Sequence, residues 1–107
     1  MDAEKLYKID EIYMLVHLYG PGGRLDSINL YPNNPSNFTD GVITINLTKD
    51  GSTSIYLDPS PLKYADLSWL VKAFSFSLEI IKKYEENGLK FLSDYDEFLI
   101  REHSYED

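Results

Sequence analysis

Few residues of this chain have the type and spacing that chemistry requires. His17 and His103 are the only histidines and cysteine is absent, so a nucleophile with an imidazole base would have to be a serine. Nothing in the sequence places a serine beside either ring. His17 lies among apolar neighbours, which is typical of a packed, hydrogen-bonded histidine, whereas His103 lies near the C-terminus and is expected to be exposed.

The run Gly20-Pro21-Gly22-Gly23-Arg24 has the glycines of a phosphate-binding loop, and an arginine that could supply charge. It lacks the Lys-Ser/Thr ending of such a loop, and no helical pattern follows it. We interpret it as a turn between two strands. A small ligand-binding domain or enzyme that uses His17 and Arg24 is kept as an alternative.

Side chains near the C-terminus could in principle ligate a hard cation. They are Asp94, Asp96, Glu97, Glu102 and His103. Their spacing does not match a calcium-binding loop, because no glycine stands at its sixth position and the later glutamate is missing. We interpret them as a solvated cluster, and we predict no metal site, cofactor or catalytic residue.

Charge is unevenly distributed along this chain, whose formal net charge is −8 at pH 7. Residues 85–107 contain eight acidic and two basic side chains, a balance of −6, whereas residues 63–84 have a balance of +2. Such asymmetry suggests an acidic contact surface. The residues that we expect to contact a partner are Glu85, Glu86, Asp94, Tyr95, Asp96, Glu97 and Glu102.

The composition is typical of one compact domain, residues 1–107. Of these residues, 43% are hydrophobic and 14% aromatic, which is too apolar for a disordered chain. No apolar run approaches the ~18 residues of a membrane span, and the acidic N-terminus does not match a signal peptide. We therefore expect a cytoplasmic protein, and its acidic balance argues against direct nucleic-acid binding.

Alternating apolar residues predict an antiparallel sheet. Residues 12–19 are apolar on both faces, which is typical of a central strand. Residues 25–31 can return as a second strand after the glycine turn, and residues 42–48 and 53–58 form a predicted hairpin.

The register of this hairpin follows from its loop. With Lys49-Asp50-Gly51 as a three-residue loop, Ile45 lies opposite Ile55 and Ile43 opposite Leu57. A two-residue loop would shift the register by one residue, so that the apolar side chains of one strand would lie opposite residues of the other face on its neighbour. We therefore predict the three-residue loop.

A long helix is predicted after Asp58-Pro59-Ser60-Pro61, with Ser60 or Asp66 as its cap and Asn87-Gly88 as its end. It carries two apolar rows. One row is Leu67, Leu70, Val71, Phe74, Leu78 and Ile81, and the other is Trp69, Ala73, Phe76, Ile80 and Tyr84. One face of a small sheet normally covers less apolar helix surface than these two rows provide. Either the sheet curls around the helix, or one flank of the helix contacts another molecule.

The last segment fits a short helix beginning at Ser93 or a strand over residues 97–103, and we prefer the helix. The predicted fold is α+β: an antiparallel sheet of about four strands in meander order, packed on one long helix, with a short C-terminal helix or strand.

These observations favour a binding protein over an enzyme. We predict a small acidic inhibitor that covers a basic, nucleic-acid-binding surface of a partner, by analogy with toxin immunity proteins and with anti-CRISPR-like, nucleic-acid-mimicking phage anti-defence proteins. Tyr84, Tyr95 and Phe98 would add contact area. The other alternative is a homo-oligomeric structural subunit whose dimer buries Trp69, Phe76 and Ile80.

Overall fold

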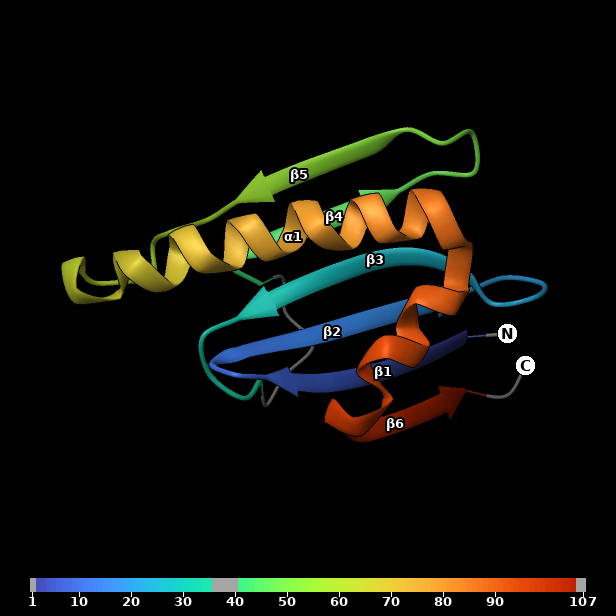
Figure 1. Cartoon of the computed structure of the whole chain (residues 1–107), viewed down its shortest axis with the longest axis horizontal. Helices are drawn as coiled ribbons and strands as arrows, with labels where there is room; N and C mark the ends of the chain where they lie inside the picture. Colours follow the sequence, from blue (N-terminus) through green and yellow to red (C-terminus); the bar gives the residue numbers. More distant parts are fainter. Residues whose placement is uncertain (1, 36–40, 106–107) are drawn as a thin grey trace.

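A computed structural model describes residues 2–35 and 41–105 and has an α+β fold (Figure 1). Six strands form one sheet, and the helices lie together on one of its faces. The strands are β1 (Asp2–Ile9), β2 (Ile12–Tyr19), β3 (Arg24–Tyr31), β4 (Ile43–Leu47), β5 (Thr53–Leu57) and β6 (Leu99–Tyr105). The helices are the 3-10 turn η1 (Tyr64–Asp66), α1 (Leu67–Asn87) and the 3-10 segment η2 (Gly88–Phe98).

The sheet is antiparallel throughout, with the order β5-β4-β3-β2-β1-β6. The first five strands form a meander and β6 returns to pair with β1, so the prediction of about four strands was two short. β1 was missed because charged residues interrupt its alternation, although Ala3 and Tyr7 are buried on the helix side and Leu6 on the other. The central position predicted for residues 12–19 is confirmed by β2.

The predicted hairpin is confirmed in β4 and β5. Ile45 pairs with Ile55 and Ile43 with Leu57, and Gly51 has a φ of +90° at the loop position that favours glycine. The Asp50 carboxylate accepts hydrogen bonds from the Thr48 hydroxyl and the Ser52 amide, which lower the pKa of Asp50 to about 2.

α1 faces the sheet with Trp69, Ala73, Ser77 and Ile80, all buried. The predicted end of the helix is confirmed, because Gly88 follows Asn87 with a φ of +62°. Asp66 stands at the N-cap of α1, but its carboxylate does not cap this helix; it accepts a hydrogen bond from the backbone amide of Lys63, which precedes η1.

The helix row proposed for a homodimer is largely inside the protein. Trp69 is 6% exposed and Ile80 is fully buried, and Phe76 packs partly buried against the same core. These side chains are not a surface that a second copy could cover, because the core of the same chain already covers Trp69 and Ile80, and Tyr95 of η2 packs against Phe76. The other row remains exposed at Leu67, Val71, Phe74 and Leu78.

The sequence offered a helix or a strand for the C-terminal segment, and the structure has one after the other: the helical part begins at Gly88 instead of Ser93, and the strand covers residues 99–105 instead of 97–103. η2 leaves the end of α1 and crosses the sheet, and β6 then pairs along β1 (Figure 1). η2 is anchored to the core by Phe91, Leu92 and Tyr95. The acidic segment is therefore folded against the domain over residues 85–105, and Glu106 and Asp107 lie outside the described residues.

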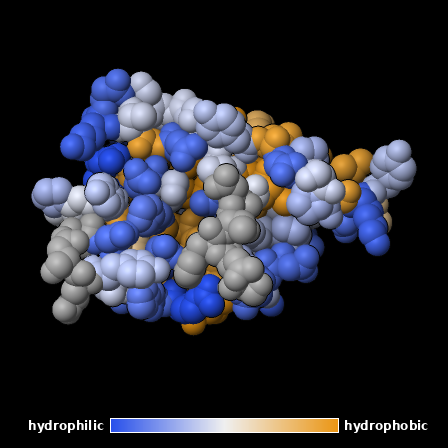
Figure 2. Space-filling model, turned by 180° about the vertical axis from the view of Figure 1, so that it is seen from behind, coloured by the Kyte–Doolittle hydropathy of each residue, from blue (hydrophilic) through white to orange (hydrophobic). Residues whose placement is uncertain are grey.

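The face of the sheet opposite the helices is mostly polar, with hydrophobic surface visible between the polar groups (Figure 2). Leu6, Leu15 and Tyr31 form a small buried cluster there, with Tyr13 packed against it. The main core lies on the helix side, so the two faces of the sheet differ in character.

Candidate functional site

The structure divides the predicted contact residues into separate groups. Asp94, Asp96 and Glu97 are exposed on η2, and Glu102 is exposed on β6. Glu85 and Glu86 are exposed near the end of α1, and Glu85 lines a cavity beside the β4–β5 loop.

Tyr95 is the clear correction to the predicted site. It is only 6% exposed, and its ring makes edge contacts with Phe76 and Phe91, with centroids 5.9 and 6.3 Å apart. Tyr95 was predicted to contact a partner, but the backbone of η2 turns its side chain toward the core. Tyr95 therefore anchors the acidic residues instead of extending from them.

Lys83 joins the acidic segment to α1. Its Nζ donates to the Tyr95 hydroxyl at 3.1 Å and lies 3.3 Å from a Glu79 carboxylate oxygen and 3.7 Å from one of Asp94. The hydrogen bond to Tyr95, with that to Glu79, raises the pKa of Lys83 despite slight desolvation. The spacing of four residues on a helix signals the Glu79–Lys83 pair within α1, but it does not signal the contacts of Lys83 with Tyr95 and Asp94.

Asp96 and Glu102 approach the buried Tyr7 from η2 and β6. Burial, followed by the charges of Asp96 and Glu102, raises the pKa of Tyr7 to about 12. Glu102 also lies 3.7 Å from Lys5. Two acids that are six residues apart in sequence are therefore both brought beside β1.

A hollow of about 340 Å³ adjoins the acidic segment. Ile9, Ile12, Phe76 and Tyr95 give it apolar walls, and Asp10, Lys72, Ser75 and Glu79 supply its polar atoms. Lys72 lies 3.7 Å from Asp10 and 3.2 Å from Glu11. The hollow therefore combines apolar walls with carboxylates that pair with lysines of the same chain.

His17 and Arg24, the residues of the alternative site, meet at Asp26. The ring nitrogens of His17 lie 2.6 Å from Asp2 and 3.1 Å from Asp26, and Arg24 lies 3.5 Å from Asp26. Partial burial lowers the pKa of His17, but the hydrogen bonds to Asp2 and Asp26 outweigh it and the net shift is upward. Because both nitrogens are engaged by carboxylates, this histidine is poorly placed to act as a general base.

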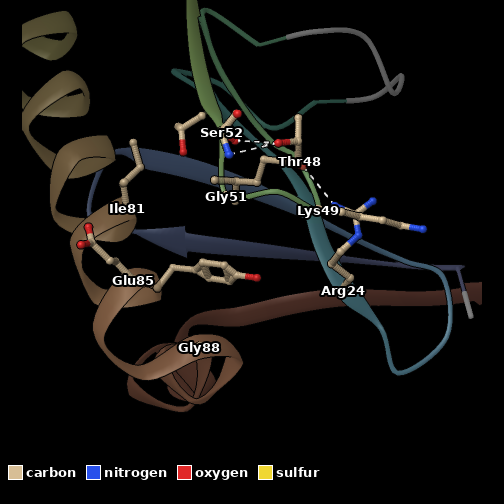
Figure 3. Close-up of a pocket in the computed structure, with 11 residues that line it drawn as sticks. Arg24, Thr48, Lys49, Gly51, Ser52, Ile81, Glu85 and Gly88 are labelled. Atoms are coloured by element: carbon tan, nitrogen blue, oxygen red, sulfur yellow. Dashed lines mark hydrogen bonds between the residues drawn. The ribbon is translucent and has the colours of Figure 1, made fainter.

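A cavity of about 620 Å³ lies between the β4–β5 loop and the end of α1 (Figure 3). Arg24 and Lys49 approach it from one side, and Ile81 and Glu85 from the helix. Arg24 is occupied, since its Nη1 donates to the Leu47 carbonyl oxygen at 3.1 Å. Charges of both signs and mainly exposed loop residues line this cavity, so its polar groups do not converge on one ligand.

Comparison with known proteins found nothing similar: no family model, curated protein or solved structure matches this chain. Among the described residues, no group of three or more His, Asp or Glu side chains is placed to hold a metal ion. The same part of the chain contains no helix that is long and apolar enough to cross a membrane.

Proposed function

We propose that this protein is a small acidic inhibitor that binds a basic partner and covers its nucleic-acid-binding surface. The observation that carries this proposal is the alternation of burial along η2. Phe91, Leu92 and Tyr95 are buried, while Asp94, Asp96 and Glu97 are exposed. Charges held on an anchored backbone bind with a smaller loss of conformational freedom than charges on a flexible tail.

The hollow beside η2 supports the same function. A lysine or arginine of the partner can place its stem against Phe76 and Tyr95 while its charge shares Glu79 with Lys83 or Asp10 with Lys72. Electrostatic attraction to the acids would speed the encounter, and this contact would slow dissociation. Inhibition follows because the partner's phosphate-binding residues are then covered. By analogy, this protein would act as toxin immunity proteins and phage anti-defence proteins do.

The test compares two variants with equal changes in charge. Asp96→Asn/Glu97→Gln removes two charges from η2, and Glu85→Gln/Glu86→Gln removes two from the end of α1. Tagged protein captures the partner from lysate at low and moderate salt, and the association rate with the purified partner is then measured.

We expect the η2 variant to lower the association rate by about tenfold and to weaken its salt dependence, while the α1 variant stays within about twofold of the unmodified protein. Equal binding by the unmodified protein and the η2 variant would refute the proposal. So would a captured partner whose nucleic-acid-binding activity is unchanged in the complex.

A further inference from the structure

β5 is an edge strand that lacks the usual protection. It lies at the end of the sheet order and pairs with β4, without a register shift. Thr53–Leu57 contains no charged residue and no proline. The opposite edge, β6, carries Arg101, Glu102 and His103, and its register with β1 is irregular. Because free edges without charge, proline or a bulge pair readily with other strands, β5 is suited to pairing and β6 is not.

The free backbone groups of β5 can be identified from its pairing with β4. The Thr48 amide donates to the Ser52 carbonyl, and the Asp58 amide donates to the Val42 carbonyl, at the two ends of the hairpin. Bonded and non-bonded pairs alternate along antiparallel strands, so every second residue between these ends directs its amide and carbonyl away from β4. These residues are Thr53, Ile55 and Leu57.

An apolar stripe on α1 lies on the same side of the molecule. It consists of Leu67, Val71, Phe74 and Leu78, which are 41–69% exposed. Their spacing places them on one flank of the helix. Ile81 continues this flank into the cavity that Thr53 of β5 also lines, and Figure 1 shows α1 over β4 with β5 beside it. Most exposed large hydrophobic side chains of the described residues are on this stripe or in β5 and η1.

We propose that a second copy of this chain binds the β5–α1 surface, defined as Thr53–Leu57 with Leu67, Val71, Phe74 and Leu78. A twofold axis perpendicular to the sheet and centred at Ile55 would pair the two β5 strands in antiparallel fashion. Ile55 then faces its own copy, and Thr53 faces Leu57 of the partner subunit. The two α1 helices lie on the same face of a continuous sheet, with their apolar stripes turned toward each other.

Size and charge both favour a second copy as the occupant. Leu57 and the four stripe residues together expose roughly 450 Å² of side-chain surface per copy, before the strand backbone and Tyr56 on the other face of the sheet are counted, against about 800 Å² per partner in a standard interface. None of the residues in the β5–α1 surface is charged, so bringing two copies together buries no like charges there. The acids of η2 lie outside this surface and remain exposed, and this dimer does not depend on the proposed inhibitory function.

The test is the molar mass in solution, measured by light scattering and sedimentation over a range of concentrations. We expect twice the 12.4 kDa chain mass at concentrations of about 10–100 µM, a range usual for moderate interfaces. Val71→Glu/Leu78→Glu should give the single-chain mass, because it places charges in the apolar stripe. Thr53→Pro should do the same, since it removes an outward-facing amide without breaking the β4 pairing.

Ile100→Glu/Tyr105→Glu is the matched control, because both side chains are exposed on the other edge strand. This control should retain the doubled mass, and circular dichroism checks that every variant is folded. A single-chain mass for the unmodified protein at all concentrations would overturn the proposal. A doubled mass in both interface variants would overturn it equally. If the helix variant fails to fold, the Thr53→Pro result decides alone.

Discussion

Trp69 donates its indole N–H to the backbone carbonyl oxygen of Glu11 across 2.8 Å, joining the first turn of α1 to the turn between β1 and β2. That turn is tight, and Asp10 adopts a φ of +53° within it. The contact links residues 58 positions apart in the chain. It therefore sets where the helix begins to lie on the sheet, and with it the position of the hollow beside η2.

Replacing Trp69 with Phe should lower the free energy of unfolding by about 1–3 kcal/mol, because the Glu11 carbonyl loses its donor and packing is lost in the core. Lys72→Ala, which removes only exposed ion pairs beside the same turn, should cost less than about 1 kcal/mol. Chemical denaturation followed by circular dichroism measures both. Similar losses in the two variants would show that the indole contact is not what holds the helix there.

The His17 contacts predict a pH-dependent stability. The raised pKa of His17 means that the charged ring stabilises the folded state below its ordinary pKa of 6.5, and that this stabilisation is lost as pH rises through the higher folded-state value. The unmodified protein should therefore exceed His17→Gln in stability by about 1 kcal/mol near pH 5.5 and by less near pH 8.5. A difference that is independent of pH would contradict the charged contact with Asp2 and Asp26.

Tyr7 predicts the behaviour of the protein at high pH. Burial and the nearby acids raise its pKa from 10.0 to about 12, so the unfolded chain ionises first as pH increases. Stability should then be unaffected below about pH 10 and should fall as pH rises toward 12. Tyr7→Phe should show a shallower decline over this interval in alkaline denaturation followed by circular dichroism. An unchanged decline would assign the alkaline effect to other groups.

Gly41 is required where the chain enters β4. A Cβ atom built there would lie 2.6 Å from the carbonyl oxygen and 2.9 Å from the amide nitrogen of Leu30, and this backbone cannot move aside cheaply. Gly41→Ala should destabilise the fold by about 1–3 kcal/mol.

The control for Gly41 is Thr44→Val, since the Gly41 amide and the Thr44 hydroxyl both donate to the Asn29 side chain, at 3.0 and 2.7 Å. Losing only the hydroxyl should cost about 1 kcal/mol. If Gly41→Ala proves the milder substitution in thermal unfolding, the steric interpretation is wrong.

Several features of the fold were predictable because their causes lie close together in sequence. The register of β4 and β5 follows from alternating apolar residues and the positive φ of Gly51. The end of α1 follows from Asn87-Gly88. The central strand β2 follows from apolar residues on both faces. The residue types of the candidate site were equally visible, as a run of acids without a catalytic or metal-binding pattern.

The sequence by itself determined the α+β class, the hairpin, the helix and the excess of acids. Only the tertiary structure decided that β6 pairs with β1, that Trp69 and Ile80 face the sheet, and that Tyr95 points into the core between exposed acids. Both apolar rows of α1 are similar in composition, so the local pattern could not show which row faces the sheet. The residues of β1 alternate poorly, so the local pattern could not show that they form a strand. That choice depends on contacts between residues far apart in the chain, which exist only once the sheet has formed.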